Sequence, residues 1–454
     1  MLIQWPSCFP ETREVHTRPH PKRERTSSIN ASLHHLVDKN IKKLIPQLSK
    51  NMANLTYLFL QMNQIPFFIL LLSFSPSSAT YENRKTLTPP PLPQPSQTDY
   101  KGCFSKVYAF GDSYTDTGNA HFTDGFQPML QQGRSPPPSG NLPGYRQCDG
   151  RLVIDYLCEY LSVPHLSAYK NSSAQFSGGA NFAIAGSTAL SSDFFTQSRL
   201  GHSLMWKQNP ESCQTQIDWF QKYLADYDCK GKDEAACKGE MANTLFWVGE
   251  MGGNDYARLY GSSSTVHSRH LTRQAVRNVC GLVRRLLDNG ARYIVVQGLP
   301  PAGCLPVQVS SCPSNERDQF GCSAKVNSLI MAHNDLLQKK LEELRQRYHD
   351  CMIIYADYWS AYITIQSNYK QYQFEEPVKA CCGAGEGPLN FDTNHLCGST
   401  GSSTCKDSNK YINWDGVHFT EAMHQHLSDL FFNQNYCKPS FAELIKKKRG
   451  TSGY

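Results

Sequence analysis

The segment KVYAFGDSYTDTGN, residues 106–119, contains the signal that decides the fold of this 454-residue chain. Its first five residues are mostly apolar, with aromatic and β-branched side chains, which is typical of a short buried strand. The predicted strand stops at Phe110, and Gly111, Asp112 and Ser113 follow directly. A serine at this point stands at the carboxyl end of a strand, where α/β sheets place their ligand sites. On its own, Ser113 is equally compatible with an ordinary helix N-cap.

Further strands and helices alternate along the chain beyond this segment. Short runs rich in Val, Ile, Phe or Tyr predict strands, and apolar residues at helical spacing predict helices. The alternation predicts one α/β domain in three layers, α/β/α, with a mostly parallel central sheet of about five strands. The predicted strands span residues 106–110, 181–185, 244–248, 293–297 and 352–355, and the predicted helices span residues 151–161, 215–224, 269–288, 324–348 and 421–432.

Three more segments carry polar or flexible residues at the edges of these elements. Gly186 follows the second predicted strand, and a glycine there lets a backbone N–H approach a substrate oxygen closely, although a tight turn also explains it. Asn254 follows the third predicted strand after two glycines, so its amide is either an oxyanion donor or part of a turn. Asp415 and His418 precede the last predicted helix, where the carboxylate can orient the imidazole to accept a proton from a serine. The alternative for His418 is a partly buried histidine without a chemical role.

Together, these five residues supply every part of an acyl-transfer site, a combination that separate turns and caps explain poorly. The G-x-S-x-G motif of the common α/β-hydrolases does not occur in the chain. His424 and His426 lack zinc-type spacing and are assigned to packing, so no metal site is predicted.

Several segments resemble conserved blocks of the plant GDSL esterase/lipase family, within the SGNH hydrolases. The resemblance covers about residues 104–438 and implies a flavodoxin-like SGNH-hydrolase fold without a cofactor. It also implies that Ser113 is the nucleophile, His418 the base and Asp415 the third triad member, with Gly186, Asn254 and the Ser113 N–H forming the oxyanion hole. The segments are FGDSYTDTGN, GRLVIDYL, NFAIAG, GEMGGND, VQGLPPAGCLP, KACCGAGEGPLNF and NWDGVHFTEA.

The resemblance implies a secreted hydrolase that acts on carboxylic esters. Residues 131–148 follow the family pattern only loosely, and Cys148 stands where the family usually has Ser before Asp149. The substrate is therefore left open among acyl lipids, acetylated sugars and phenolic esters. Two alternatives remain: an acyltransferase that uses the same acyl-enzyme, and a secreted binding protein whose catalytic site has decayed.

Residues 1–102 of the chain are predicted to lie outside the folded domain. An apolar stretch over residues 55–74 precedes small residues up to Ala79, which indicates a signal peptide at residues 52–79. Residues 1–51 are then an N-terminal extension that is absent from the mature protein. An uncleaved anchor is disfavoured because the stretch is short and interrupted by polar residues, so we expect no stable membrane span. The remaining divisions are a Pro-rich linker at residues 80–102, the hydrolase domain at 103–438 and a basic, solvated tail at 439–454.

The net charge of +6 comes from the two ends of the chain. Residues 1–51 carry nine Lys or Arg and four Asp or Glu, and residues 446–449 add four positive charges. Removing both contributions leaves about −3 for the rest, which disfavours a nucleic-acid-binding surface. We expect a monomer whose partner is a small ester.

Sixteen of the seventeen cysteines lie after residue 100, and none forms a C-x-x-C pair. Their spacing predicts local disulfides, which persist in oxidising compartments and favour secretion to the cell wall or apoplast. Cys158 and Cys280 fall in helical patterns and are predicted as buried free thiols. Asn171 begins an N-x-S sequon and is a predicted glycosylation site. The groups expected to pair locally are 229/237, 304/312/322 and 381/382/397/405.

Overall fold

The computed structural model describes residues 100–123, 145–198, 211–260, 268–385 and 387–451. The predicted N-terminal extension, the signal peptide and most of the Pro-rich linker lie outside the described residues, as does most of the loop at 131–148.

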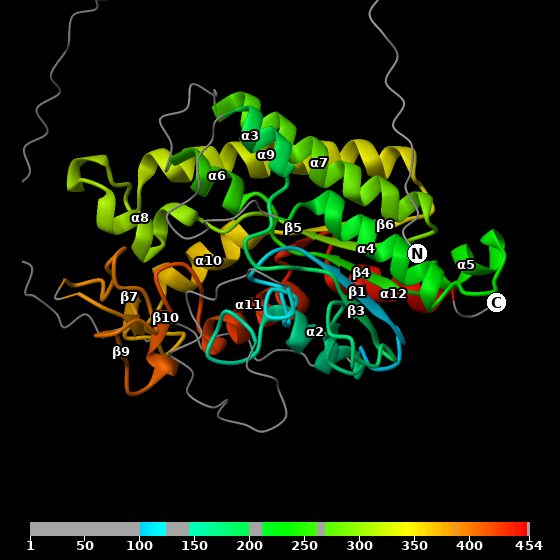
Figure 1. Cartoon of the computed structure of the whole chain (residues 1–454), viewed down its shortest axis with the longest axis horizontal. Helices are drawn as coiled ribbons and strands as arrows, with labels where there is room; N and C mark the ends of the chain where they lie inside the picture. Colours follow the sequence, from blue (N-terminus) through cyan, green and yellow to red (C-terminus); the bar gives the residue numbers. More distant parts are fainter. Residues whose placement is uncertain (1–99, 124–144, 199–210, 261–267, 386, 452–454) are drawn as a thin grey trace, which may run out of the picture. The chain divides into compact units, whose positions relative to one another are not determined.

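A seven-stranded sheet forms the middle of the domain (Figure 1). Its order is β11-β6-β5-β4-β1-β3-β2, and every neighbouring pair is parallel except β11 with β6. The predicted α/β fold with a mostly parallel sheet is therefore confirmed. The two strands beyond the five predicted are two-residue strands at the sheet edges. The bounds are β1 Val107–Phe110, β2 Ser167–Ala168, β3 Gly179–Asn181, β4 Leu245–Val248, β5 Tyr293–Gln297, β6 Met352–Ala356 and β11 Cys437–Lys438.

The strands are apolar along their whole length because both faces of the sheet are covered. Side chains alternate between the two faces. Val107 and Ala109 of β1 pack in one core cluster with α2, α10, α11 and α12, whereas Tyr108 and Phe110 pack in another with α4, α7 and α9. These helices form the two outer layers. Their bounds are α2 Val153–Leu161, α4 Cys213–Asp226, α7 Ser268–Asp288, α9 Ala324–Arg347, α10 Tyr358–Ser367, α11 Glu421–Asn433 and α12 Phe441–Thr451.

Shorter elements lie outside the central sheet and its two helix layers. Two small sheets, β10 with β7 and β8 with β9, lie apart from the central sheet. The bounds are α3 Ser192–Gln197, α5 Glu234–Met241, α6 Gly253–Tyr260, α8 Pro306–Ser311, β7 Glu376–Ala380, β8 Cys382–Gly383, β9 Ser403–Thr404 and β10 Tyr411–Asn413, with 3-10 turns η1 Ala302–Cys304, η2 Ser314–Glu316 and η3 Ser408–Lys410.

Two predicted boundaries differ from the structure. The strand expected at residues 181–185 is β3 at Gly179–Asn181. The residues after it still run beside β1, since the Phe182 N–H donates to the Ala109 carbonyl at 2.7 Å, but they then turn toward Gly186.

The basic tail expected at 439–454 is also different, because residues up to 451 form α12. Phe441, Leu444 and Ile445 are buried in the core, and the Lys448 ammonium lies 5.8 Å from the Phe104 ring. The apolar residues spaced three and four apart in FAELI explain this packing, which the run of lysines obscured. Tyr100 is likewise buried, so the folded region begins before residue 103.

Four local disulfides are present among the described residues. They join Cys229 to Cys237, Cys304 to Cys322, Cys381 to Cys405 and Cys382 to Cys397. Each lies within one of the predicted groups, and Cys158 and Cys280 are buried free thiols as predicted.

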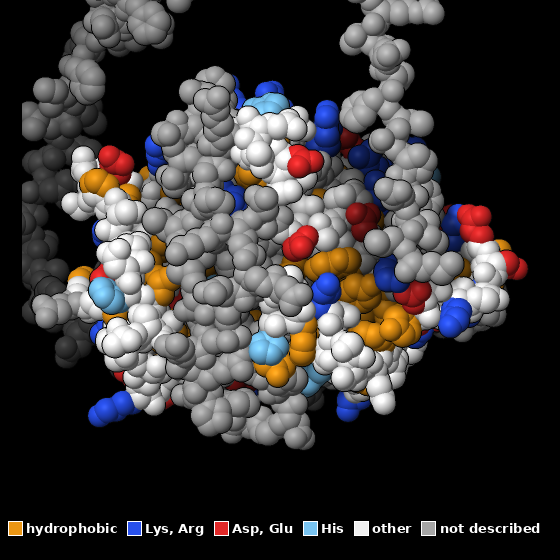
Figure 2. All heavy atoms as spheres, in the orientation of Figure 1, with side chains coloured by type: hydrophobic (Ala, Val, Ile, Leu, Met, Phe, Trp, Pro, Cys, Tyr) orange, Lys and Arg blue, Asp and Glu red, His pale blue; other side chains and the backbone are white. Residues whose placement is uncertain are grey.

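Charged side chains are scattered on the face shown in Figure 2, where Lys and Arg alternate with Asp and Glu among the described residues. None of the helices in the described ranges is both long enough and apolar enough to cross a bilayer. The same residues contain no group of three or more His, Cys, Asp and Glu side chains placed to hold a metal.

Candidate active site

Ser113 lies at the edge of the sheet where the parallel strands end. Val107 pairs with Leu245 and Leu245 with Tyr293, so β1, β4 and β5 run in register and end together. One turn of backbone follows β1, with the Thr115 and Asp116 N–H groups both donating to the Asp112 carbonyl. The turn holds Ser113 in a buried position at the carboxyl edge, as predicted.

The loop after Ser113 is tied down by Asp116 and Asn119. The Asp116 carboxylate accepts the N–H groups of Gly118, Asn119 and Ala185 at 2.6–2.8 Å. The Asn119 amide donates to the carbonyls of Asn181 and Ala183, both at 2.7 Å. The side chains of Asp116 and Asn119 thus connect the serine turn, through hydrogen bonds, to the segment that leads to Gly186.

His418 lies between Ser113 and Asp415. Its Nε2 is 3.0 Å from the Ser113 Oγ, and its Nδ1 is 2.9 Å from Asp415 Oδ2. Asp415 Oδ1 also accepts the backbone N–H groups of Val417 and His418 at 2.7 Å. All three side chains are buried. A hydroxyl, an imidazole and a carboxylate in this order can carry a proton away from the serine and return it.

The turn that carries Asp415 and His418 projects from β10. The Trp414 N–H donates to the His418 carbonyl at 2.8 Å, and Thr420 caps α11 by accepting the Met423 N–H. The Tyr114 hydroxyl donates to the Val417 carbonyl at 2.6 Å. This last bond joins the histidine turn directly to the residue after the serine.

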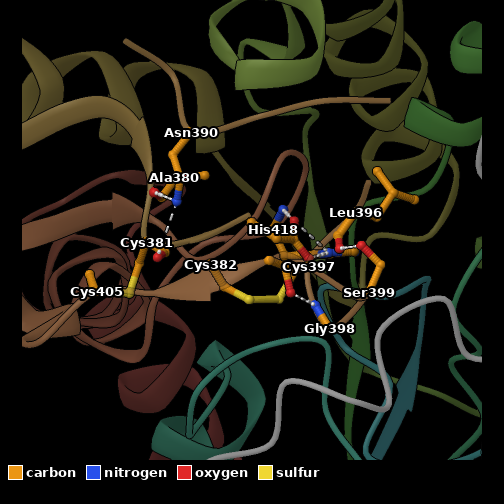
Figure 3. Close-up of a disulfide and its surroundings, with 12 residues drawn as sticks. Ala380, Cys381, Cys382, Asn390, Leu396, Cys397, Gly398, Ser399, Cys405 and His418 are labelled. Carbon is orange, nitrogen blue, oxygen red and sulfur yellow. Dashed lines mark hydrogen bonds and ion pairs between the residues drawn. A yellow bond between two sulfur atoms is a disulfide. The ribbon is translucent and has the colours of Figure 1, made fainter. Parts of the chain in front are cut away.

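Two disulfides lie beside the histidine turn (Figure 3). Cys381 and Cys382 donate their backbone N–H groups to the carbonyls of Asn413 and Trp414, at 3.0 and 2.6 Å. Their sulfurs bond to Cys405 and Cys397.

The loop closed by these disulfides also packs on the turn. A Cβ at Gly416 would lie only 2.1 Å from the Phe391 ring, so a side chain at this position requires the ring to move. Thr393 of the same loop lines the cavity beside Ser113. The loop thus braces the histidine turn and forms part of the wall of the site.

Asn254 lies in the first turn of α6 and lines the same cavity. Its Nδ2 donates to Asp112 Oδ2 at 2.8 Å and to the Ser187 carbonyl at 3.0 Å. Gly186 precedes Ser187 and has a left-handed φ of +79°, which favours glycine. Gly186 is not among the residues that line the cavity. Three of the five predicted residues, Ser113, Asn254 and His418, therefore line one cavity. Asp415 lies behind His418 as its hydrogen-bond partner, and Gly186 is one residue from a partner of Asn254.

The cavity beside Ser113 has a volume of about 320 Å³ and is mainly apolar. Among the described residues that line it there is no Lys or Arg, and its acidic groups are Asp112 and Glu250. Burial raises the pKa of both carboxyl groups, that of Glu250 well above its ordinary value. Apolar lining side chains include Leu299, Leu305, Val307, Val326, Ile330 and Val417.

Sequence reasoning assigned no role to Glu250, Tyr114 or Thr393. Glu250 and Tyr114 do lie inside the quoted segments GEMGGND and FGDSYTDTGN, so their position beside Asn254 and Ser113 was a usable signal. Thr393 gave no signal because the disulfide loop brings it to the cavity from outside the sheet.

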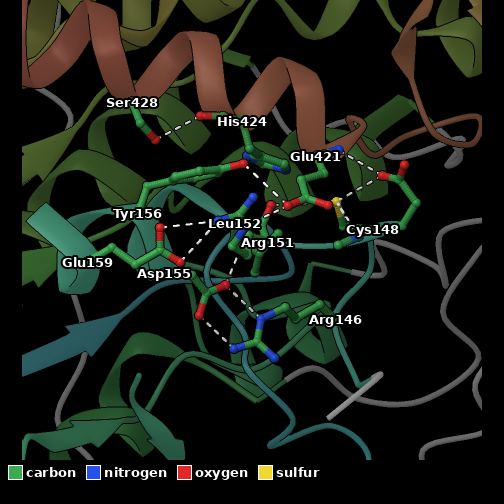
Figure 4. Close-up of polar contacts among 12 residues, drawn as sticks. Arg146, Cys148, Arg151, Leu152, Asp155, Tyr156, Glu159, Glu421, His424 and Ser428 are labelled. Atoms are coloured by element: carbon green, nitrogen blue, oxygen red, sulfur yellow. Dashed lines mark hydrogen bonds and ion pairs between the residues drawn. The ribbon is translucent and has the colours of Figure 1, made fainter. Parts of the chain in front are cut away.

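The segment around Cys148 supports α11, the helix that follows His418 (Figure 4). Asp149 Oδ1 accepts the Glu421 N–H at 2.7 Å, and Arg151 Nε donates to the Glu421 carboxylate at 2.5 Å. The Cys148 Sγ accepts the Gly150 N–H at 3.4 Å, so the thiol takes a local turn-forming role here.

A buried ion pair supports the start of α2 in the same region (Figure 4). Arg146 donates to both carboxylate oxygens of Asp155, at 2.7 and 2.6 Å. Arg146 lowers the pKa of Asp155 despite its burial. His424 lies in the core nearby, and burial lowers its pKa to about 3, in line with a packing role.

A family comparison matches residues 107–431 to the GDSL-like lipase/acylhydrolase family, which is most of the chain and all of the region just described. The chain belongs to this family. It is therefore a GDSL enzyme of the ester hydrolase class, acting on ester substrates.

Curated relatives agree with this membership. A GDSL esterase/lipase of Arabidopsis thaliana is 39% identical over 356 residues, covering 76% of this chain and 90% of the relative. Acetylajmalan esterase 2 of Rauvolfia serpentina is 35% identical over 338 residues, covering 71% and 88%. A second Arabidopsis GDSL esterase/lipase is 35% identical over 361 residues, covering 74% and 92%.

Proposed function

We propose that this GDSL enzyme hydrolyses carboxylic esters through a triad of Ser113, His418 and Asp415, with a covalent acyl-enzyme intermediate. The observation that carries the proposal is the continuous contact from the Ser113 hydroxyl through both ring nitrogens of His418 to the Asp415 carboxylate. Without the imidazole contact, a buried serine hydroxyl is a weak nucleophile at neutral pH.

The reaction proceeds in two halves. Ser113 Oγ attacks the carbonyl carbon while His418 Nε2 takes the hydroxyl proton, and Asp415 stabilises the imidazolium. The ester C–O bond then breaks, and His418 returns the proton to the leaving alcohol. Water attacks the acyl-enzyme by the same route, giving the carboxylic acid and free Ser113.

When Ser113 attacks, negative charge develops on the carbonyl oxygen of the ester, and hydrogen-bond donors at the edge of the sheet must stabilise it. We assign this role to the Ser113 N–H, the Gly186 N–H and the Asn254 amide. Asn254 lines the cavity beside Ser113, and its amide now donates to Asp112 and the Ser187 carbonyl. It can reach an oxyanion by sharing or exchanging one of these contacts.

The cavity favours a neutral ester with an apolar acyl or alcohol group. Its described lining is mainly apolar and lacks a cation that would pair with an anionic substrate. We expect neutral p-nitrophenyl esters to be cleaved faster than analogues that carry a second carboxylate. Equal rates for the two series would contradict this substrate preference.

We also infer that the mature enzyme is secreted and glycosylated at Asn171. Four disulfides among the described residues favour an oxidising compartment, and the Asn171 sequon lies in the loop after β2 with Ser172 and Ser173 exposed. N-terminal sequencing of the mature protein should begin at Thr80. A sequence that begins well before Ala79 would remove the support for a signal peptide at residues 52–79.

The test of the nucleophile is covalent labelling by a fluorophosphonate, followed by peptide mapping. We expect the label on Ser113, and Ser113→Ala should lose both labelling and ester hydrolysis while its melting temperature stays unchanged. Ser428→Ala is a matched control, because Ser428 is also buried but donates only to the His424 carbonyl in α11. Full activity in Ser113→Ala would refute the triad. Transfer of the acyl group to an added alcohol in preference to water would indicate an acyltransferase.

A further inference from the structure

Two buried carboxyl groups meet beside the nucleophile. Asp112 is 2% exposed and Glu250 is 1% exposed. The two side chains lie within hydrogen-bonding reach of each other. Glu250 Oε2 has no N–H or hydroxyl donor among the described residues. A hydrogen bond between two carboxyl groups requires a proton on one of them, since two ionised carboxylates have none to donate.

Both carboxyl groups also contact the segment that carries Asn254. Asp112 Oδ2 accepts the Asn254 amide at 2.8 Å, while its Oδ1 accepts the Tyr114 N–H at 3.0 Å. Glu250 Oε1 accepts the N–H of Gly253, the residue before Asn254, at 2.7 Å. The pair therefore holds the Asn254 side chain through one carboxyl group and its backbone through the other.

The surroundings favour keeping one proton on the pair. Burial raises the pKa of Asp112 and raises that of Glu250 well above its ordinary value. The titratable groups that interact with the pair include the carboxyl groups of Asp116 and Asp255 and the hydroxyls of Tyr114 and Tyr358, and His418 lines the same cavity. The carboxyl groups and hydroxyls cannot compensate a second negative charge.

We propose that Glu250 is a positioning residue for the oxyanion hole: it donates a shared proton to Asp112, and the pair keeps the Asn254 amide aimed into the cavity. The inference rests on the proposed function, because it assumes that Asn254 contacts the oxyanion. Glu250 touches no reacting atom in this scheme. Its loss should therefore lower kcat more than it changes KM, since the oxyanion forms only in the transition state.

The same arrangement makes the oxyanion hole sensitive to alkaline pH. When the shared proton is lost, the Asp112–Glu250 hydrogen bond is replaced by repulsion between two carboxylates about one hydrogen bond apart. Asn254 then loses its fixed position. We expect the kcat of the wild-type enzyme to decline on the alkaline side of its pH profile.

Two variants of Glu250 test the proposal in the full-length enzyme. Glu250→Gln keeps an oxygen for the Gly253 N–H and a donor for Asp112, but it has no proton to lose. We expect it to retain kcat within about threefold at neutral pH and to lack the alkaline decline. Glu250→Ala removes both contacts, and we expect a fall in kcat of about 10- to 100-fold with KM within about twofold, as for a slightly misplaced catalytic group.

A matched control separates positioning from general stability. Asn334 is buried behind Leu299, another residue of the cavity wall, and its amide bonds both backbone groups of Leu299 at 2.8 and 2.9 Å. Asn334→Ala should lower the melting temperature and leave the shape of the kcat–pH profile unchanged.

Two results would overturn the inference. One is a pH profile and kcat in Glu250→Ala that match those of the wild type, and the other is an alkaline decline that persists unchanged in Glu250→Gln. Ser113→Ala is assayed in parallel to distinguish a failure of the Glu250 role from a failure of the triad. If Ser113→Ala is inactive while the Glu250 variants keep the wild-type kcat and pH profile, only the role of Glu250 is refuted. If Ser113→Ala remains active, the triad itself is refuted.

Discussion

Ser113 and His418 reach the same cavity from two regions that are held in different ways. Ser113 follows a strand of the central sheet, and its turn is fixed by backbone hydrogen bonds and by the packing of β1 between two helix layers. His418 lies on a turn outside the sheet, held by β10, the Tyr114 hydroxyl and a loop with two disulfides. The difference teaches that the nucleophile is positioned by the fold itself, whereas the base depends on covalent bracing added beside it.

Outside the triad itself, the largest effect is expected on the sheet side, from Asn254→Ala. Loss of one oxyanion donor should reduce kcat by about 10²- to 10³-fold, with a small change in KM. Steady-state kinetics on a short p-nitrophenyl ester measures this. A comparable rise in KM at constant kcat would mean that Asn254 binds the ground state, and the sheet edge would then supply only the nucleophile.

An intermediate effect is expected on the braced side. The double variant Cys382→Ser/Cys397→Ser should lose about 2–4 kcal/mol of stability, because the loop is no longer closed in the unfolded chain. The Cys382 N–H donates to the Trp414 carbonyl, at the start of the turn that carries His418. Release of the loop should therefore disturb the contact between His418 and Ser113, and we expect kcat at 25 °C to fall by about tenfold.

The matched control for this prediction is Cys229→Ser/Cys237→Ser. That disulfide links the turn after α4 to α5, and neither residue lines the cavity. The control should lose stability and keep kcat. Equal losses of kcat in both double variants would show that the brace beside His418 has no special role.

The smallest effect on catalysis is expected from a change that weakens the scaffold of the sheet. Asp155→Asn breaks the buried pair with Arg146 and should cost about 3–5 kcal/mol of stability. Because the pKa of Asp155 is lowered in the folded state, the wild type has this stability above the unfolded pKa of about 4 and loses it as the pH falls below that value. Denaturant titrations at neutral and acidic pH should show the variant and the wild type converging at low pH. The kcat of the folded variant should stay near that of the wild type, and a large loss would mean that the nucleophile is less firmly held than the fold implies.

The parts that could be predicted from sequence are those governed by local patterns. Apolar strands such as the one ending at Phe110, and helices with regular apolar spacing, gave the layers and the sheet. Ser113, Asn254 and the Asp415/His418 pair were found because they sit next to such elements. Their distances were not available from sequence, since they depend on the register between β1 and β4, which are more than a hundred residues apart in the chain.

The parts that escaped prediction depend on contacts distant in sequence. Thr393 joins the cavity only because disulfides fold its loop back over the site. The pairing of Glu250 with Asp112 requires β1 and β4 to be neighbours. The α12 helix was missed because its lysines suggested a solvated end, although its apolar residues pack on the sheet layer.

That last helix has a practical consequence for protein engineering. The ring of Tyr100, at the start of the described region, lies 5.3 Å from the ring of Phe441, and Arg449 contacts the Cys103 sulfur at 3.3 Å. The beginning and the end of the domain are therefore neighbours, as they are in many domains that tolerate circular permutation. A short peptide could join them to give a permuted enzyme, and a truncation at residue 438 would instead strip a buried face from the core.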